Sequence, residues 1–457
     1  MTELVPQSHD VVVALDIGTT KVCCLAGRKN THGKLEILGV GKVDSVGVLR
    51  GVVSNIEKTV NAIREAVDIC ERQARMKFHV VHVGIAGQHI KSLQHRGILT
   101  RESDHNEIAQ RDIDRLVNDM FKLVLPPGDK IIHVFPQEFT VDNEQGITDP
   151  IGMCGVRLEA NFHIITGQIT AVNNIFRCVE KAGLNAAELT LEPIASAAAV
   201  LFEEEKQAGV ALVDIGGGTT DITIFHEGII RHTAVIPFGG NVVTADIKEG
   251  CTVMQPQAEK LKVKFGKALA IEAQENAIVS IPGLRGRAPK EISVKNLAHI
   301  IQARMEEILE HVYFQIRLSG YENKLIGGIV VTGGGARLQD LQYLAEYLTG
   351  LDARIGLPAE QLSVNSQRSE FNDPMYATAI GLLVKATERN PVPTEEPEPE
   401  PAALPAEPAF EATPVVVAQE ETEETQPAES AGQNGSWLEN FLRRSREWLE
   451  GDIKDFQ

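Results

Sequence analysis

Two stretches of the chain share one pattern of hydrophobic and polar positions. Residues 10–27 read as an apolar strand, a Gly-Thr-Thr turn and a second apolar strand, and residues 209–230 repeat that order. The two copies start about 200 residues apart, which is too far for a solenoid repeat. The pattern therefore predicts two related α/β domains, each of which opens with a β-hairpin.

Helical patterning follows each hairpin. Apolar residues recur at spacings of three and four over 54–72 and again over 256–271, which predicts an amphipathic helix in each stretch. Residues 326–350 read as a buried strand, a glycine turn and another amphipathic helix. Residues 88–165 mix charged helical and strand-like patterning and contain no glycine-rich phosphate loop, so we interpret them as an inserted subdomain.

The character of the chain changes after Ala386. Residues 390–435 contain nine prolines and eleven Glu but no Lys, Arg or Asp, so they can bury too little apolar surface to offset the entropy of ordering. This composition predicts a disordered acidic linker whose r.m.s. span is on the order of 40 Å.

The last 22 residues have an amphipathic pattern instead. On a helical wheel their bulky apolar side chains share one arc, with arginines at and beyond its margins. The residues concerned are Trp437, Leu438, Phe441, Leu442, Trp448 and Leu449, with Arg443, Arg444 and Arg446. Such a helix suits a bilayer interface, where the guanidinium groups reach the phosphates of anionic lipids. A helix that docks on the protein's own body or in a partner's groove would show the same pattern.

The net charge of −19 is unevenly distributed, since the linker carries −11, the last 22 residues −1 and residues 1–389 the remaining −7. Nucleic acid is excluded as a general partner because binding it needs a basic excess. The six cysteines show neither a disulfide framework nor zinc spacing. With no apolar run of about 18 residues and no signal-peptide pattern, we expect a cytoplasmic protein.

The two hairpins carry the clearest chemistry. A glycine turn between strands exposes backbone N–H groups that donate to phosphate oxygens, and threonine hydroxyls add further donors. Asp16 and Asp214 each precede the first glycine of a turn by two residues, where a carboxylate can hold the hydration shell of Mg²⁺ on a nucleotide. One such hairpin could equally be an ordinary glycine-rich turn, but the duplication favours a phosphate site.

The third glycine turn, at Gly333, Gly334 and Gly335, is not a dinucleotide fingerprint, because Leu338 occupies the place of the last glycine. The turn still offers a flat backbone surface and a helix N-terminus to a phosphate or a purine. The alternative is a tight strand-to-helix connection without a ligand.

Together these segments resemble the actin/Hsp70/sugar-kinase superfamily of nucleotide-binding proteins. In chain order, residues 10–27 and 209–230 resemble its two phosphate motifs, 169–201 and 373–386 its connecting motifs, and 329–338 its adenosine motif. The resemblance implies a two-lobed actin-like α/β fold of the ribonuclease-H-like type, with ATP between the lobes and Mg²⁺ near Asp16 and Asp214, held through water. The residues that it assigns to ATP are Asp16, Gly18, Thr19, Thr20, Lys21, Asp214, Gly216, Gly217, Gly218, Thr219, Thr220, Glu259, Lys262, Gly333, Gly334, Gly335 and Ala336.

Glu192 is the one candidate catalytic residue. It stands where some relatives keep a carboxylate that orients the attacking water. The other interpretation is that Glu192 and Pro193 only begin a helix. ATP hydrolysis is therefore predicted to be slow or weak at most.

Within the superfamily, residues 47–60, 238–247, 258–266, 281–293 and 332–350 closely resemble the FtsA family of bacterial cell-division proteins. The resemblance divides the chain into subdomains 1A (10–87, 166–200 and 373–389), 1C (88–165), 2A (201–239 and 311–372) and 2B (240–310). The disordered acidic linker (390–435) and a C-terminal amphipathic, membrane-targeting helix (436–457) follow.

The same resemblance implies an ATP-binding cytoskeletal adaptor. It would polymerise with itself at the cytoplasmic face of the cell membrane, bind anionic lipids and anchor the ring of the tubulin-like protein FtsZ at the division site. The C-terminal peptide of FtsZ would dock on subdomain 2B, where Arg285, Arg287, Lys290 and Arg304 are candidate contacts or, alternatively, a solvated face. Later division proteins would bind through subdomain 1C. The alternative function is an actin-fold ATPase of another class, an Hsp70-like chaperone or a sugar kinase.

Overall fold

The structure is a computed structural model that describes residues 5–6, 11–30, 32–101, 107–283, 288–363 and 370–388. All of them belong to the first of the two units into which the chain divides, residues 1–394 and 395–457. The predicted linker and the predicted membrane helix lie outside the described residues, as do Arg285 and Arg287.

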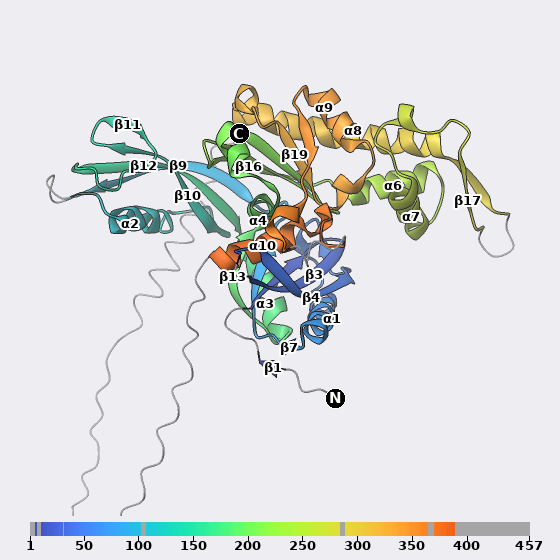
Figure 1. Cartoon of the computed structure of the whole chain (residues 1–457), viewed down its shortest axis with the longest axis horizontal. Helices are drawn as coiled ribbons and strands as arrows, with labels where there is room; N and C mark the ends of the chain where they lie inside the picture. The colour runs from blue at the N-terminus through green and yellow to red at the C-terminus, as the bar shows by residue number, and fades with distance from the viewer. Residues whose placement is uncertain are drawn as a thin grey trace, which may run out of the picture. The chain divides into compact units, whose positions relative to one another are not determined.

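The first lobe is built on a five-stranded sheet of order β13-β8-β2-β3-β4. Its strands are β2 (Val12–Ile17), β3 (Lys21–Lys29), β4 (Leu35–Asp44), β8 (Val80–Ile85) and β13 (Asn185–Leu191). The first three form an antiparallel meander, and β8 and β13 run parallel to β2. In Figure 1, β3 and β4 lie between α1 (Ile56–Ala74) on one face and α10 (Ala377–Glu388) on the other. The sheet therefore has both faces covered, as the mostly buried strands β2, β3 and β8 require.

Helix α1 illustrates how closely the layers approach. The Asn55 side chain caps it by accepting a hydrogen bond from the Lys58 backbone, and Arg75 ends it in the left-handed conformation. A Cβ atom at Gly41 of β4 would overlap the Ala66 carbonyl of α1. On the other face, a Cβ at Gly381 of α10 would overlap the Ala195 carbonyl of α4 (Glu192–Val200). Glycine at these two positions lets helix backbone pack directly on its neighbour.

The second lobe repeats the plan with a sheet of order β16-β15-β14-β19-β20. Its strands are β14 (Val210–Ile215), β15 (Thr220–His226), β16 (Ile229–Ile236), β19 (Ile329–Thr332) and β20 (Ala353–Ile355). Its helices are α6 (Gly240–Gly250), α7 (Gln255–Phe265), α8 (Val294–Ser319) and α9 (Leu341–Thr349), with a small hairpin of β17 (Ile278–Ile281) and β18 (Lys290–Ser293). The duplication read from the hydrophobic pattern is thus a duplication of sheets, and the expected two-lobed α/β fold is confirmed.

The inserted segment forms a subdomain with a core of its own. Its sheet has the order β11-β10-β12-β9, from β9 (Lys91–Thr100), β10 (Asp129–Val141), β11 (Glu144–Ile147) and β12 (Arg157–Gln168). Helix α2 (Gln110–Met120) buries Leu116 and Met120 against Phe162 and Leu158 of this sheet. Helix α3 (Ile169–Lys181) then returns the chain to the first lobe.

The remaining elements are short. They are β1 (Val5–Pro6), β5 (Val48–Leu49), β6 (Val52–Val53), β7 (Met76–Lys77), α5 (Glu203–Ala208) and the 3-10 turns Ala270–Glu272, Glu322–Lys324, Gly334–Arg337, Pro358–Gln361 and Pro374–Tyr376. Two helix predictions need correction here. The helix expected over 256–271 ends at Phe265, because Gly266 leaves the helical conformation. After Gly333, a 3-10 turn precedes α9, so the helix starts at Leu341 and not at the glycines.

A candidate nucleotide cleft between the lobes

The two glycine-rich hairpins close in the same way. The Gly18 backbone N–H donates to the Lys21 carbonyl at 2.9 Å, and the Gly216 N–H donates to the Thr219 carbonyl at 2.9 Å. Beyond the turns the strands stay in one register, with Asp16 opposite Cys23 and Asp214 opposite Asp221. The sequence duplication therefore places two equivalent turns at the ends of two equivalent strand pairs.

The two turns face each other and touch. A Cβ atom at Gly218 would lie 2.6 Å from Thr19 Oγ1, and one at Gly217 would overlap the Thr20 side chain. Thr19 Oγ1 is held by a hydrogen bond from the Gly51 N–H at 3.1 Å. Backbone N–H groups and threonine hydroxyls from both lobes thus line one cavity of about 420 Å³.

The structure brings together nearly all of the predicted ATP-binding residues. Those that line the cavity are Asp16, Gly18, Thr19, Thr20, Lys21, Asp214, Gly216, Gly217, Gly218, Thr219, Glu259, Lys262, Gly333, Gly334 and Gly335, and the candidate catalytic residue Glu192 lines it as well. Thr220 and Ala336 do not line it. Both are buried, and Thr220 Oγ1 donates to the Phe238 carbonyl at 2.9 Å, which fixes the end of the second hairpin.

Gly333 forms one wall of the cavity and has a backbone conformation that suits glycine. Its φ of +83° lies in the left-handed region, and a Cβ there would overlap Asp214 Oδ1. Gly334 meets no atom within 4 Å of its ideal Cβ position, so this part of the wall is open. The turn therefore brings bare backbone against the carboxylate of the second hairpin.

Lys262 and Glu259 of α7 form another part of the lining. Lys262 Nζ pairs with Glu259 at 2.9 Å and donates to the Gly240 carbonyl at 2.9 Å and to Thr244 Oγ1 at 2.8 Å. These bonds tie α7 to the first turns of α6, so the lysine is positioned before any ligand binds.

Four carboxylates crowd the floor of the cavity around one lysine. Lys21 forms an ion pair with Asp16, whose side chain is buried. Burial lowers the pKa of Lys21, but the Asp16 carboxylate more than offsets this, so the net shift is upward. Burial raises the pKa of Asp214, although a hydrogen bond from Ser196 Oγ at 2.6 Å opposes the shift. Burial and the charge of Asp214 raise the pKa of Asp221 to about 8.

Glu192 is the fourth of these carboxylates. Burial, followed by the charges of Asp16, Asp221 and Asp214, raises its pKa well above the usual range, which disfavours its ionised form. It is also the first residue of α4 and is followed by Pro193, as the interpretation of this pair as a helix start predicts. The catalytic role of Glu192 stays a prediction.

The donor set fits a divalent cation. Carboxylate oxygens are the ligands that Mg²⁺ prefers, and the buried Oδ1 of Asp221 has no hydrogen-bond partner among the described residues. In the part of the chain that the structure describes, no three acidic, His or Cys side chains are arranged to ligate a metal directly.

Asp221 is the residue that sequence reasoning missed. Aligning the two hairpins would have found it, because it occupies the position of Cys23 in the first copy. Lys42 and Asn241 also line the cavity, but aligning the two hairpins would not have identified them.

The structure describes two of the four candidate contacts for the FtsZ peptide, Arg304 and Lys290. Arg304 is engaged in ion pairs with Asp246 at 2.5 Å and with Glu307, so it is not a free cation. Lys290 is exposed on β18, where it donates to the Thr252 carbonyl at 3.3 Å.

Comparison with known proteins identifies the family. A family model described as "Cell division protein FtsA" matches residues 211–381, and one described as "SHS2 domain inserted in FTSA" matches residues 87–166. The cell division protein FtsA of Pseudomonas aeruginosa is 40% identical over 378 residues, which cover 83% of this chain and 89% of that protein. The chain belongs to the FtsA family. The FtsA proteins of Neisseria meningitidis (39% identical, 82% of this chain and 90% of that protein) and Bacillus subtilis (36%, 82% and 83%) agree with this assignment.

A solved structure supports the fold of this FtsA-family chain. The "PilM-PilN type IV pilus biogenesis complex" superposes with a TM-score of 0.61 over 83% of this chain and 99% of that one, at 15% identity. The actin-like fold with an inserted subdomain, expected from the sequence, is confirmed, as is a role in cell division. Among the described residues, no helix is both long and apolar enough to cross a bilayer.

Proposed function

We propose that this FtsA-family protein is an ATP-binding, actin-like adaptor that polymerises at the cytoplasmic face of the cell membrane and anchors the FtsZ ring at the division site. The observation that carries the nucleotide part is the contact between two equivalent hairpin turns across one cavity. A ligand with a chain of phosphates would bind both turns at once and so couple its binding to the angle between the lobes.

Each wall of the cavity has a distinct role in this proposal. The N–H groups of both turns and the Lys21 ammonium would hold the phosphates, and the Gly333 turn and α7 would hold the nucleoside. Mg²⁺ would neutralise phosphate charge when bound, with Asp16 and Asp214 holding its water shell. Asp221 strengthens this assignment, since a cation nearby would favour the ionised form of its carboxylate.

Glu192 explains why hydrolysis is proposed to be slow or weak at most. A general base must be ionised, and burial together with the neighbouring carboxylates raises the pKa of Glu192, which disfavours its ionised form. Gly84 lies directly against this side chain, so its carboxyl group has little freedom to move.

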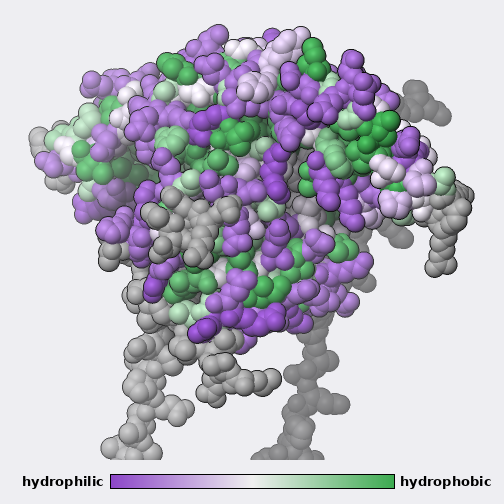
Figure 2. Space-filling view, turned by 45° about the vertical axis from the view of Figure 1, so that its right-hand side comes forward, coloured by the Kyte–Doolittle hydropathy of each residue, from purple (hydrophilic) through white to green (hydrophobic). Residues whose placement is uncertain are grey.

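Self-association has a physical basis on the surface of the second lobe. Phe314 and Leu318 lie one turn apart on α8 and are 58% and 65% exposed, and Tyr343 and Tyr347 on α9 are 61% and 81% exposed. Figure 2 shows separate apolar patches of this kind on an otherwise hydrophilic face. Exposed apolar patches favour association between proteins, and a polymer would present many tail helices to the membrane at once.

The partner contacts complete the proposal. The FtsZ C-terminal peptide would dock on the part of the second lobe that holds β18, where Lys290 is exposed, and later division proteins would contact the inserted subdomain. Anionic lipids would bind the tail, through Trp437, Phe441 and the neighbouring arginines.

Liposome co-sedimentation in the presence of ATP tests the membrane part. The full chain should sediment with anionic vesicles, and a chain truncated after Gly435 should stay in the supernatant. Equal sedimentation of the two chains would refute tethering by the tail.

The nucleotide part is tested separately. Asp214→Ala should abolish Mg²⁺-dependent retention of ATP, whereas Asp119→Ala, on the exposed face of α2, should retain it. Unchanged retention by Asp214→Ala would refute the assignment of the cleft.

A further inference from the structure

The inserted subdomain belongs to one lobe through the chain and touches the other through its side chains. The chain leaves the first-lobe sheet at the end of β8, forms the subdomain and returns to the first lobe through α3. Its strands β9, β10 and β12 nevertheless contact β16, the edge strand of the second-lobe sheet. Figure 1 shows β9 running from the inserted sheet toward β16. The subdomain therefore bridges the two lobes.

Three hydrogen bonds join the subdomain to β16. His163 of β12 and Thr233 of β16 are both buried, and a hydrogen bond of 3.0 Å links Nε2 of the first to Oγ1 of the second. Ser92 Oγ of β9 donates to the Thr233 carbonyl at 3.2 Å. Gln137 Nε2 of β10 donates to the Ile230 carbonyl at 3.0 Å. Each of the three strands thus contributes one bond across the boundary.

An ion pair adds a fourth contact. Arg231 of β16, whose side chain is 4% exposed, pairs with Glu138 of β10 at 3.2 Å and with Glu227 of its own lobe at 2.7 Å. The two carboxylates are similarly exposed, at 46% and 52%. One guanidinium group therefore binds one carboxylate on each side of the boundary. We call the contacts that Ser92, Gln137, Glu138 and His163 make with β16 the latch.

Part of the same boundary is hollow. A cavity of about 360 Å³ opens between Phe135 and Pro136 of β10 and Ile229 and Ile230 of the second lobe, and α4 of the first lobe also lines it. Because apolar packing is incomplete here, the latch contributes a larger share of the attachment than it would beside a continuous core. The subdomain can therefore shift against the second lobe without breaking a packed core.

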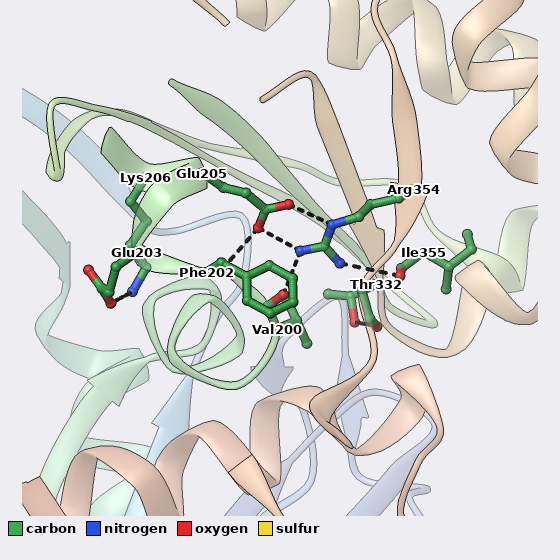
Figure 3. A network of polar contacts seen from close by, with 9 residues as sticks. Val200, Phe202, Glu203, Glu205, Lys206, Thr332, Arg354 and Ile355 are labelled. Carbon is green, nitrogen blue, oxygen red and sulfur yellow. Dashed lines mark hydrogen bonds and ion pairs between the residues drawn. The ribbon is translucent and has the colours of Figure 1, made fainter. Parts of the chain in front are cut away.

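A separate polar network fixes the connection between the lobes. Figure 3 shows Arg354 of β20 binding the Glu205 carboxylate through two nitrogens, each at 2.6 Å, while it also donates to the Val200 carbonyl at 2.9 Å. The guanidinium carbon lies 5.0 Å from the centre of the Phe202 ring. Val200 ends α4 of the first lobe, and Glu205 lies on α5, which leads into β14 of the second. This network therefore marks the point about which the lobes can turn.

The nucleotide cleft is in contact with both ends of this arrangement. On the second lobe, β16 pairs with β15, which starts directly after the second glycine turn. On the first lobe, a Cβ at Gly218 of that turn would lie 3.0 Å from Arg50 Cα, and a Cβ at Gly51 would lie 2.6 Å from Gly87 Cα, where the chain enters the subdomain. Close packing transmits small displacements. A movement of the second turn relative to the first lobe must therefore displace β16 against the subdomain.

We propose that the latch regulates the nucleotide cleft, because it favours the arrangement of the lobes in which the two hairpin turns touch and so raises the affinity for ATP. The latch and the contact between the turns are present together in one arrangement. A ligand that holds both turns favours the latch, and by reciprocity the latch favours the ligand. A protein that drew the subdomain away from β16 would weaken ATP binding by the same factor. The inference rests on the proposed binding of ATP and adds a means of controlling it.

Calorimetric titration of the full chain with ATP and Mg²⁺ tests the coupling. Thr233→Val removes the hydroxyl that His163 binds, and the net loss of one buried hydrogen bond predicts an affinity about 2- to 10-fold lower. Thr223→Val is the matched control. Thr223 is buried opposite Thr233 on β15, and its hydroxyl has no hydrogen-bond partner among the described residues, so its loss should leave the affinity unchanged.

A second pair of variants guards against misfolding, because it changes only half-exposed carboxylates. Glu138→Gln breaks the ion pair of Arg231 across the boundary and should lower the affinity by about 1.5- to 5-fold. Glu227→Gln breaks the pair of the same arginine within the second lobe and should leave the affinity unchanged. In the reciprocal direction, ATP should slow amide hydrogen exchange in β16, and Thr233→Val should reduce this protection whereas Thr223→Val should not.

The outcomes separate the coupling from the nucleotide site itself. If the unchanged chain retains no ATP, the proposed function of the cleft is refuted and the coupling with it. If the unchanged chain binds ATP and each latch variant binds it as tightly as its control, the coupling is refuted and the proposed function stands. An equal fall in a latch variant and its control would also refute the coupling, because the loss would then arise within the second lobe.

Discussion

The contact between the two hairpin turns makes a sharp prediction about Gly218. An alanine there would place its Cβ 2.6 Å from Thr19 Oγ1 and 2.8 Å from Thr19 Cγ2, whereas ordinary contact begins at 3.4 Å. The two turns would have to separate by about 0.8 Å, the shortfall in the closest contact. The lobes could then no longer close fully on a ligand that both turns bind.

The expected loss follows from the cost of overpacking. An added methyl group in a tightly packed site costs about 1–3 kcal/mol, which is a loss of about 5- to 150-fold in affinity for ATP. Asp119→Ala, at an exposed position on α2 outside the cavity, is the control. It should bind ATP with nearly wild-type affinity.

Calorimetric titration with ATP and Mg²⁺ measures these affinities, and a double-mutant cycle isolates the contact. Thr19→Ala removes the two closest of the three atoms that the new methyl group would meet and leaves Arg50 Cα at 3.0 Å, so Gly218→Ala should cost less in that background. If Gly218→Ala binds ATP as tightly as Asp119→Ala, or if its cost is the same with and without Thr19, the contact between the turns has no role in closing the cleft.

Two further predictions concern stability. Arg354→Lys cannot reproduce the two-nitrogen contact with Glu205 and should lower the free energy of unfolding by about 1–3 kcal/mol in urea denaturation. Arg28→Lys, in the exposed pair with Glu36, should change it by less than about 0.5 kcal/mol, and equal effects would contradict the role given to Arg354. The pKa of Asp221 is raised from 3.8 to about 8, so the folded state holds this proton, and without nucleotide the protein should lose stability as the pH rises from about 4 to 8. Thermal unfolding of Asp221→Asn across that range should show a weaker loss, and a pH profile identical to that of the unchanged chain would refute the shift.

Much of the architecture could be predicted from the sequence because it depends on local pattern. The duplicated strand, turn and strand are visible as apolar runs around Gly18 and Gly216, and the structure places both in equivalent sheets. The inserted subdomain was detectable by the absence of a phosphate loop between residues 88 and 165. These features need no knowledge of which segments meet in space.

The features that were missed depend on such meetings. Aligning the two hairpins marks Asp221 only as a departure from Cys23, whereas its raised pKa depends on burial and on Asp214, which lies opposite it in the strand pair. From the sequence, Arg304 was a candidate contact for the acids of the FtsZ peptide. In the structure its guanidinium group is already paired with Asp246, which lies 58 residues earlier in the chain. The helix expected over 256–271 was predicted too long. The spacing of apolar residues continues past Gly266, where the backbone becomes extended and the helix ends. Pattern predicts elements, but burial and pairing set the chemistry of their side chains.

Because α10 returns to the first lobe, the order of the segments in the chain sets the order in which the two lobes can finish folding during translation. This helix buries Ile380, Leu382 and Leu383 in the core of a lobe whose preceding helix, α4, ends at Val200. The ribosome must therefore make the 176 residues between Val200 and Ala377, for roughly 10 to 35 seconds, before the first lobe can close. The second lobe can fold in that interval, whereas the amphipathic tail emerges only after α10 has been made. The order of the segments thus delays synthesis of the tail, for which lipid binding is proposed, until the whole body has been made.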